Sequence, residues 1–153
     1  MRRGTCAIGA YGVCGPLLAW LRNYLSDRRI SAAVGGHASA AQAIDAGVPY
    51  GSVLEPTLFL LYINDLEDFL PEGVHLAVYA DDTTLYVTIE TTASVQSSIA
   101  TLQQAVDVLE SWGRDWFITF EPTKSQCMTL TRHRLDWQLP SIIFGGCSVP
   151  EVD

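Results

Sequence analysis

The sequence predicts an α+β domain in which helices back an antiparallel sheet. Two observations indicate this fold. Residues 74–89 form two β-type runs that meet at Asp81-Asp82, and the segments 56–70 and 93–113 each carry apolar residues at helical spacing. A sheet with one apolar face and helices with one apolar stripe bury these surfaces against each other. We therefore expect the hairpin at the centre of the sheet, with both helices behind it.

The register of the hairpin follows from the alternation of its side chains. If Asp81 and Asp82 form a two-residue turn, the cross-strand pairs are Ala80–Thr83, Val78–Leu85, Leu76–Val87 and Val74–Ile89. These pairs make one face almost wholly apolar. The other face carries the remaining residues: His75, Ala77, Tyr79, Thr84, Tyr86 and Thr88. We predict that the first face packs on the core and that the second faces a cleft, with both carboxylates at the tip.

The adjacent carboxylates of Asp81 and Asp82 fit two different roles. Two carboxylates at a strand tip can share a divalent cation, because hard oxygen ligands suit Mg²⁺ and the cation offsets their mutual repulsion. The same dipeptide suits a turn without a ligand, because aspartate bonds its own backbone and tolerates left-handed geometry. Residue type and spacing leave both interpretations open.

The composition favours a folded protein with little positive charge. The chain has 153 residues, of which 48% are hydrophobic and only 17% charged, so a single packed unit is expected and disorder is not. Its net charge is −8, with 9 Lys and Arg residues. Phosphate affinity comes mainly from Lys and Arg, so we expect weak nucleic-acid binding by this acidic chain alone.

The cysteines and the N-terminal segment indicate where the protein resides. The 4 cysteines, at positions 6, 14, 127 and 147, show neither Cys-x-x-Cys pairing nor zinc spacing. We expect free thiols of an intracellular protein in the nucleus or cytoplasm. Residues 7–21 are mostly apolar, but several glycines and Pro16 argue against a signal peptide or a membrane span. We expect a protein that is not secreted and has no membrane partner.

Further elements follow from periodicity and from turn residues. They are a helix at 16–26 after Pro16, a strand at 28–34 ending at Gly35-Gly36, a loop at 47–52 with Ser52 as N-cap of the 56–70 helix, an N-cap at Thr91 or Thr92 for the next helix, strands at 116–120 and 126–131, and a hairpin at 141–149. Pro71 should end the 56–70 helix.

Arg22, Arg28 and Arg29 fit either phosphate contacts or a solvated helix end.

Five blocks of residues occur in a fixed order between residues 12 and 146. They are Gly12-Val13-Cys14-Gly15 with Leu18, Trp20, Leu21, Tyr24, Leu25 and Arg28; residues 46–54 with Pro56 and residues 58–66; Tyr79-Ala80-Asp81-Asp82; Phe120 with residues 122–125; and Ile143-Phe144-Gly145-Gly146. In composition and order these blocks resemble the reverse transcriptases of non-LTR, LINE-type (jockey-like) retrotransposons. The resemblance covers nearly the whole chain.

The resemblance implies a partial reverse transcriptase domain over residues 1–153, with an incomplete, polymerase palm-like antiparallel sheet. Residues 12–70 would supply helices of the fingers and palm and the nucleotide loop, and residues 74–89 the metal hairpin. Residues 93–131 would form a palm helix and strands, and residues 141–153 the start of a thumb-side hairpin. The implied activity is RNA-directed DNA synthesis, with an RNA template, a DNA primer, dNTPs and Mg²⁺, for which Mn²⁺ can substitute.

The resemblance also assigns metal and catalytic roles. Polymerases of this kind use a pair of metal ions for in-line phosphoryl transfer. Asp81 would be a direct metal ligand and Asp82 a weaker or second ligand. A third essential aspartate would lie on a strand before the helix at 16–26, and this chain begins after the point where that strand should have ended. We therefore expect the 153-residue chain alone not to extend a primer.

The resemblance assigns Pro49, Tyr50, Gly51 and Tyr79 to nucleotide binding. Tyr50 stands where the family usually has glutamine, whose amide both donates and accepts hydrogen bonds. A tyrosine does not reproduce that pattern but can stack on a base or ribose. Lys124 matches a catalytic lysine near the triphosphate, where an ammonium neutralises charge or protonates the leaving group. An exposed loop lysine and cross-strand packing of Tyr79 are the structural alternatives.

Two other interpretations of the chain remain at this stage. One is a catalytically dead retrotransposon remnant, acting at most as a folded nucleic-acid or protein interaction module. The other is a truncated gene model with no independent role.

Overall fold

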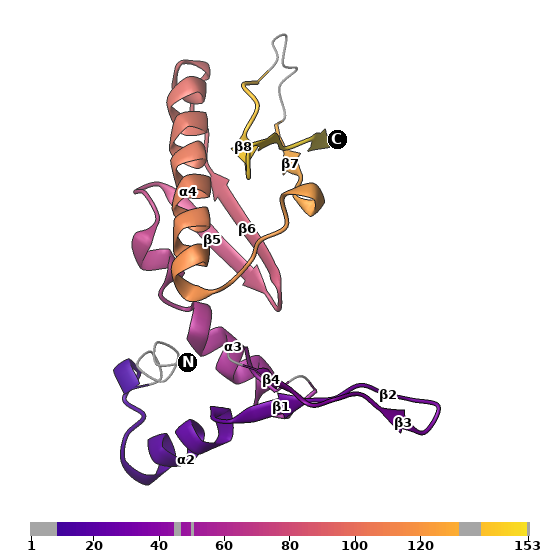
Figure 1. The fold of residues 1–153 in the computed structure, drawn as a ribbon. Helices are drawn as coiled ribbons and strands as arrows, with labels where there is room; N and C mark the ends of the chain where they lie inside the picture. The colour runs from indigo at the N-terminus through magenta and orange to yellow at the C-terminus, as the bar shows by residue number, and fades with distance from the viewer. Residues whose placement is uncertain (1–8, 45–46, 50, 132–138, 153) are drawn as a thin grey trace. The chain divides into compact units, whose positions relative to one another are not determined.

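The computed structural model of the protein describes residues 9–44, 47–49, 51–131 and 139–152. The expectation of a single packed unit is wrong, because the chain divides into two units, Met1–Asn64 and Asp65–Asp153 (Figure 1). Both contain helices and short strands, which agrees with the predicted α+β class. None of the helices found among the described residues is both long enough and apolar enough to cross a membrane.

The core of the first unit lies between two helices. Helix α2 spans Gly15–Leu25 and has Pro16 in its first turn, where the missing N–H costs nothing, as predicted. Its Leu21 and Leu25 pack with Leu58 of α3 (Glu55–Ile63). Partly buried hydrophobic residues surround this contact: Val13, Leu18, Tyr24, Val48 and Leu54.

An extended hairpin follows α2 (Figure 1). Strand β1 (Arg28–Ile30) pairs antiparallel with β4 (Gln42–Ile44), and β2 (Ala33–Val34) pairs with β3 (His37–Ala38). The predicted strand at 28–34 is therefore present but interrupted. The chain reverses at Gly35-Gly36, where both residues have positive φ, 59° and 81°, a conformation that glycine adopts without steric cost.

The prediction of one continuous helix at 56–70 is wrong. Helix α3 ends at Ile63, and the 3₁₀-helix η1 (Leu66–Phe69) follows after a break at Asn64 and Asp65. Both residues of the break have side-chain partners: Asn64 Nδ2 donates to the Tyr11 hydroxyl at 2.9 Å, and Asp65 accepts from Trp112 at 3.2 Å. These side-chain hydrogen bonds anchor each residue within its own unit.

The start of α3 also differs from the prediction. The N-cap is Leu54, and Ser52 takes no part in capping through its side chain. The Ser52 carbonyl instead accepts from the Glu55 amide at 3.1 Å, and the Ser52 hydroxyl is buried without a hydrogen-bond partner. The other end of the segment agrees with the prediction, because Leu70 is extended before Pro71.

The hairpin of the second unit has the predicted faces but a different register. Strand β5 (Val74–Tyr79) pairs with β6 (Asp82–Val87), so that Val78 lies opposite Thr83 and Leu76 opposite Leu85. Each β5 residue thus pairs two positions earlier in β6 than predicted, because the turn is Ala80-Asp81. A shift of two residues preserves the faces.

Burial confirms these faces. Val74 is buried and its neighbours on the apolar face are half-buried: Leu76, Val78, Thr83, Leu85 and Val87. Every residue of the opposite face within the two strands is exposed.

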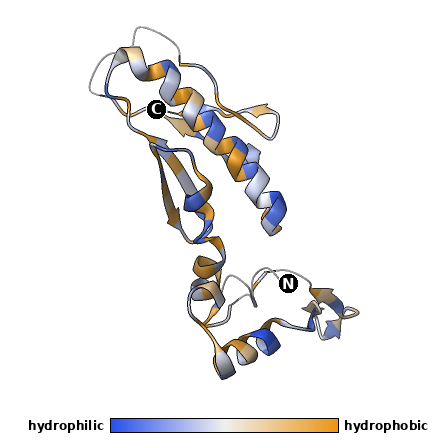
Figure 2. Ribbon diagram, turned by 90° about the vertical axis from the view of Figure 1, so that its left-hand side faces the viewer, coloured by the Kyte–Doolittle hydropathy of each residue, from blue (hydrophilic) through white to orange (hydrophobic). Residues whose placement is uncertain are grey.

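Helix α4 (Val95–Trp116) packs against both strands of this hairpin (Figure 1). A capping box joins Thr91 and Ser94 at the 3₁₀-helix η2 (Thr92–Ser94), so Thr91 caps this short helix. The predicted cap of the long helix is wrong, because the N-cap of α4 itself is Ser94. The buried residues of α4 are Val95, Ala105, Leu109, Trp112 and Gly113. Figure 2 shows hydrophobic and hydrophilic residues alternating along α4, as expected for a helix with one buried stripe.

The segment after α4 forms less strand than predicted. The strand at 116–120 is wrong, because α4 continues to Trp116 and ends at Phe117, whose φ of 57° is left-handed. The strand at 126–131 is reduced to β7 (Cys127–Met128), which pairs in parallel with β10 (Glu151–Val152). The last hairpin is confirmed, as β8 (Ile143–Phe144) and β9 (Cys147–Ser148) around Gly145-Gly146.

The hairpin at 74–89 is not the centre of a larger sheet. Each sheet formed by the described residues has two strands. The prediction required further strands beside β5 and β6, and the segments expected to supply them mostly take other conformations. Two long helices were predicted behind the hairpin, at 56–70 and 93–113. Among the described residues, only the second of them, α4, is a continuous helix that packs against β5 and β6.

Candidate metal and nucleotide site

The two candidate metal ligands lie at the tip of the β5–β6 hairpin. Asp81 is the second residue of the turn, and Asp82 begins β6 opposite Tyr79. Both aspartates are exposed. Hard carboxylate oxygens suit Mg²⁺, and two of them fill about two of its six positions, leaving the others to water or substrate. The described residues contain no group of three or more His, Cys, Asp and Glu side chains arranged to hold a metal ion.

Ala80 sets the backbone geometry of this tip. Its φ of 52° lies in the left-handed region, where a residue with a Cβ costs about 1–2 kcal/mol. Strained backbone of this kind persists only where the surroundings enforce it, and here the paired strands on both sides do so. The sequence analysis placed Asp81 and Asp82 in the turn and expected an aspartate to adopt the left-handed conformation. In the structure Ala80 adopts it, which is why the predicted register differs from the observed one.

Tyr79 lies on the predicted open face. It pairs with Asp82, and its side chain is 83% exposed. Farther along the same face, Tyr86 stacks on His75. Cross-strand packing therefore accounts for Tyr86, whereas the Tyr79 ring is largely exposed to solvent.

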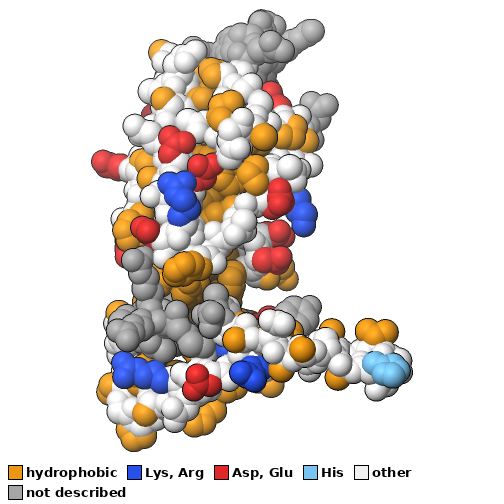
Figure 3. Space-filling model, in the orientation of Figure 1, with side chains coloured by type: hydrophobic (Ala, Val, Ile, Leu, Met, Phe, Trp, Pro, Cys, Tyr) orange, Lys and Arg blue, Asp and Glu red, His pale blue; other side chains and the backbone are white. Residues whose placement is uncertain are grey.

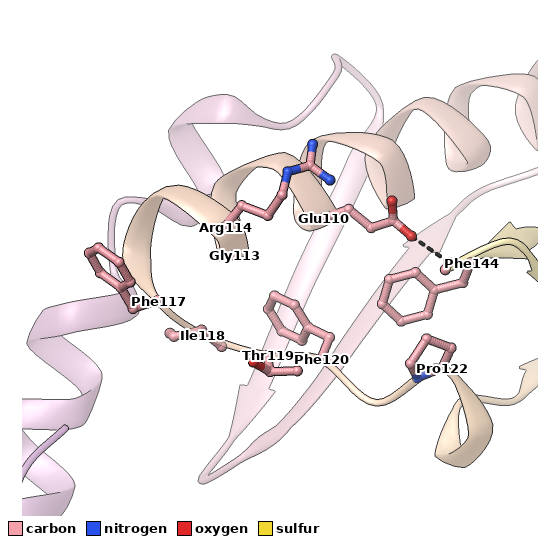
Figure 4. A pocket seen from close by; sticks show the side chains of 10 residues that line it. Glu110, Gly113, Arg114, Phe117, Ile118, Thr119, Phe120, Pro122 and Phe144 are labelled. Atoms are coloured by element: carbon pink, nitrogen blue, oxygen red, sulfur yellow. Dashed lines mark hydrogen bonds between the residues drawn. The ribbon is translucent and has the colours of Figure 1, made fainter. Parts of the chain in front are cut away.

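Lys124 lies apart from the carboxylates. It ends the 3₁₀-helix η3 (Pro122–Lys124) and is exposed. Figures 1 and 4 both show η3 away from the tip of the β5–β6 hairpin. The local conformation is held by Glu121, whose carboxylate accepts from the Thr123 hydroxyl at 2.7 Å and from the Thr123 amide at 3.3 Å. These hydrogen bonds, that of the hydroxyl first, lower the pKa of Glu121.

The predicted nucleotide loop belongs to the first unit, whereas the carboxylates belong to the second. Pro49 is half-buried, Gly51 is exposed with φ 74°, and the Gly51 amide donates to the Glu55 carboxylate. Tyr50 lies outside the described residues. The Glu55 carboxylate thus holds the loop at the start of α3.

Arg28 supports the same loop. Its Nε donates to the Leu25 carbonyl at 3.2 Å, and Nη2 donates to the Gly47 carbonyl. The guanidinium therefore joins the end of α2 to the beginning of the loop. This structural role accounts for Arg28, while Arg22 and Arg29 are exposed and fit both earlier interpretations.

Two polar residues of α4 that the sequence interpretation missed hold the β8–β9 hairpin. Gln103 makes hydrogen bonds with the backbone of Ile143, and Glu110 accepts from the Gly145 amide (Figure 4). They are seven residues apart, about two helical turns, and so lie on one side of α4. In the sequence these residues stand out only as two long polar side chains beside the apolar stripe of the helix. Nothing in the sequence indicates that they bind the backbone of Ile143 and Gly145.

A pocket of about 520 Å³ lies at the C-terminal end of α4. Its lining residues are Glu110, Gly113, Arg114, Phe117, Ile118, Thr119, Phe120, Pro122, Phe144 and Gly145 (Figure 4). The pocket is where the fourth and fifth sequence blocks meet, since the Phe120 and Phe144 rings lie 6.5 Å apart between centroids. No predicted site residue lines it.

Comparison with known proteins identifies the family of the chain. Residues 2–147 match the model of the family described as reverse transcriptase (RNA-dependent DNA polymerase). The protein therefore belongs to the reverse transcriptase family, as the five sequence blocks indicated.

The relatives come from mobile elements. The chain is 29% identical over 132 residues to the RNA-directed DNA polymerase from mobile element jockey of Drosophila melanogaster, and 32% identical over 136 residues to that of Drosophila funebris. The matches cover 82% and 85% of this chain. It is 32% identical over 125 residues, 75% of the chain, to the probable RNA-directed DNA polymerase from transposon BS.

The match spans only a small part of each relative, 14% of the length of both jockey proteins and 13% of the transposon BS protein. No solved structure matches the chain.

Proposed function

We propose that this chain supplies the metal-binding hairpin and the nucleotide loop of an RNA-directed DNA polymerase of a mobile element. The observation that supports the proposal most is the pair Asp81-Asp82, exposed at the tip of a hairpin whose apolar face rests on α4. A palm-like arrangement of this hairpin and helix would aim the carboxylates at a bound nucleic acid. The substrates would be dNTPs, an RNA template and a DNA primer, in an intracellular compartment.

The donor set at the tip fits Mg²⁺, with Mn²⁺ as a substitute, because both ligands are hard carboxylate oxygens. When bound, a pair of such ions polarises the attacking and leaving oxygens of an in-line phosphoryl transfer. Asp81 would be the direct ligand and Asp82 the second one. The paired strands and α4 fix the backbone that carries these two residues, so that little backbone reorganisation would be needed during the reaction.

The remaining residues would act on the nucleotide. The ammonium of Lys124 would neutralise the triphosphate or donate a proton to the leaving pyrophosphate. Pro49, Tyr50 and Gly51 would border the nucleotide, with Tyr50 stacking where relatives of this type hold an amide. Tyr79, with 83% of its side chain exposed beside Asp82, would contact a base or sugar next to the metal.

A second candidate function is a folded interaction module without catalytic activity. The acidic charge of −8 favours it, because strong binding of a nucleic-acid duplex relies on Lys and Arg. Metal binding separates the two candidates, since an interaction module has no need of a cation at the hairpin tip.

The test is Mn²⁺-dependent water proton relaxation with the wild-type chain and with Asp81→Asn, Asp82→Asn and Glu90→Gln. Glu90 is an exposed carboxylate just beyond β6 and serves as the control for loss of one charge. The proposal expects weak binding that Asp81→Asn and Asp82→Asn reduce and Glu90→Gln preserves. Equal binding by all four proteins would remove the hairpin tip as the metal site.

A further inference from the structure

We infer that Glu55 lowers the affinity of the nucleotide loop, because its carboxylate occupies a backbone amide that the phosphates of a nucleotide would otherwise bind. The inference rests on the proposed function, in which Pro49, Tyr50 and Gly51 border the nucleotide. It adds a residue to which the sequence analysis gave no role. The ligand class is a polyphosphate, recognised at this amide through its anionic oxygens.

The contact joins the loop to the first turn of α3. The Gly51 amide donates to Oε2 of Glu55, and Glu55 is the first residue of α3. A carboxylate at this position is favoured by the helix dipole, and its negative charge strengthens the hydrogen bond. The contact therefore has the chemistry of an anion bound at a helix N-terminus, with the anion supplied by the chain itself.

The two ends of the loop are held in different ways. Gly51 has a φ of 74°, which glycine adopts without steric cost, and its amide donates to Glu55. At the other end the Arg28 guanidinium donates to the Gly47 carbonyl. An anionic ligand binds donors and not carbonyl oxygens. Of these two contacts, only that of Glu55 occupies a group that such a ligand can use.

The Ser52 hydroxyl is a second polar group of the loop that an anion can use. It is buried and has no hydrogen-bond partner, and it directly follows the Gly51 amide in the chain. Buried polar groups are nearly always hydrogen-bonded, so this hydroxyl retains an unused capacity to donate. A phosphate oxygen that replaced the Glu55 carboxylate at Gly51 would lie one residue from this hydroxyl and offer it an acceptor.

The charge of the first unit favours an anionic ligand. Residues 1–64 hold 5 of the 9 Lys and Arg residues and 3 of the 17 Asp and Glu residues, a net charge of +2, so residues 65–153, with 4 basic and 14 acidic residues, carry −10. Figure 3 shows acidic side chains outnumbering basic ones over the visible face of the second unit. A polyphosphate is attracted by the first charge and repelled by the second. Glu55 is one of the 3 acidic residues of the first unit and places its charge against the loop.

Glu55 opposes ligand binding in two ways. The Gly51 amide is available only in the fraction of molecules in which the carboxylate has moved away, and the apparent affinity falls by that fraction. An amide that is occupied about nine-tenths of the time lowers the affinity about tenfold. The carboxylate also repels incoming phosphates. A residue that only ordered the loop would act with the opposite sign, because order in the free loop strengthens binding.

The experiment is an NMR titration of the isotope-labelled full chain with dTTP, with inorganic tripolyphosphate and with thymidine. EDTA is present, so that no cation bridges the ligand and a carboxylate. The proteins are the wild type, Glu55→Ala, Glu55→Gln and Asp27→Asn. Asp27 is the matched control, an exposed acidic residue of the same unit with a φ of 50°, which asparagine tolerates.

We expect Glu55→Ala to bind dTTP and tripolyphosphate about threefold to tenfold more tightly than the wild type. Glu55→Gln should show a smaller gain, because its uncharged oxygen still accepts from the Gly51 amide. Asp27→Asn should stay within about twofold of the wild type, because its charge lies outside the loop. Thymidine, which has no phosphate, should bind all four proteins alike. Unchanged, weaker or undetectable binding of tripolyphosphate by Glu55→Ala would overturn the inference.

A measurement on the wild-type protein alone keeps the test decisive if a variant misfolds. As dTTP is added, the resonances of the Gly51 amide and the Glu55 carboxyl group should shift together, because the ligand separates the two groups. A Glu55 carboxyl resonance that stays constant throughout the titration would contradict the inference.

Failure of this inference differs from failure of the proposed function. The titration contains no divalent cation, so tighter phosphate binding by Glu55→Ala would survive a finding that Asp81 and Asp82 hold no Mn²⁺. Conversely, Mn²⁺ binding at Asp81 together with unchanged phosphate affinity in Glu55→Ala would remove the role of Glu55 and leave the metal site in place.

Discussion

Gln103 of α4 pairs with Ile143 of β8 as a neighbouring strand would. Its side-chain Nε2 donates to the Ile143 carbonyl at 2.8 Å, and its Oε1 accepts from the Ile143 amide at 2.8 Å. The side-chain amide of glutamine has the same donor and acceptor as a peptide group. A helix residue thus satisfies both backbone polar groups of Ile143 on the edge of a two-stranded sheet.

Gln103→Ala should therefore lower the free energy of unfolding by about 1–3 kcal/mol, the sum of two ordinary hydrogen bonds. The matched control is Gln104→Ala, which changes the next residue of the same helix, an exposed one. Urea denaturation measures the stability, and amide hydrogen exchange at Ile143 locates the effect. Equal losses in both variants would show that the Gln103 contact contributes nothing specific.

A glycine beside this contact tests the packing at the pocket. A Cβ added to Gly145 would lie 2.5 Å from Cγ of Pro122, whereas one added to Gly146 would meet nothing within 4 Å. Both glycines have positive φ, so both alanine variants bear the same kind of backbone cost. We expect Gly145→Ala to be less stable than Gly146→Ala by about 1–3 kcal/mol in urea denaturation, the usual cost of overpacking. Equal stability of the two variants would mean that the close approach of Gly145 to Pro122 does not constrain the packing here.

At Ala80, where the backbone is strained, a substitution is expected to raise stability. Glycine adopts the left-handed conformation without the steric cost that alanine bears at φ 52°. Ala80→Gly should raise the free energy of unfolding by about 1 kcal/mol, whereas Ala77→Gly in the middle of β5 should lower it by about 0.5–1 kcal/mol. Thermal or urea denaturation of the two variants checks the pair. Destabilisation by both would place Ala80 in ordinary backbone geometry.

Asp65 gives a pH dependence. Burial raises the pKa of its carboxyl above 3.8, only partly opposed by the hydrogen bond from Trp112. The folded state therefore binds the proton more tightly than the unfolded state does. Its contribution to stability is fully present below the unfolded pKa and is lost as the pH rises from about 3.8 through the folded pKa.

Asp65→Asn should remove this loss while keeping an oxygen that accepts from Trp112 Nε1. The measurement is the free energy of unfolding of wild type and variant, by urea, at intervals from about pH 3.5 to about pH 6. The difference between them should grow with pH in favour of the variant. Glu72→Gln, which changes an exposed carboxylate nearby in sequence, should show no such trend, and a constant difference for Asp65→Asn would contradict the assignment.

The sequence predicted the elements whose signals are local and repeated. The stripe of α4, the proline-led start of α2 and the two faces of the hairpin recur over many residues, so single errors do not change the result. The hairpin register depended on one turn, and the left-handed residue is Ala80, to which turn preferences give no weight. The break at Asn64 and Asp65 depends on distant partners, Tyr11 and Trp112, that no local pattern contains.

The candidate site divides in the same way. The alternation of side chains in one hairpin was enough to predict that Asp81, Asp82 and Tyr79 are exposed near its tip. The structure shows this exposure. The roles of Pro49, Tyr50, Gly51 and Lys124 depend on long-range assembly, which sequence spacing does not encode. Gln103 and Glu110 were missed because their partners are backbone groups some 35–40 residues away. Backbone partners leave no trace in side-chain identity.

The central claim is that Asp81 and Asp82 serve templated DNA synthesis. The most direct test places this chain in a jockey polymerase, in exchange for the matching segment, and measures primer extension on an RNA template with Mg²⁺ and with Mn²⁺. The chimera with Glu90→Gln and the 153-residue chain alone are the controls, and the chain alone should not extend a primer. We predict template-dependent extension by the chimera that falls by roughly a hundredfold to a thousandfold or more in Asp81→Ala and is preserved in Glu90→Gln. Extension that survives Asp81→Ala would contradict the claim.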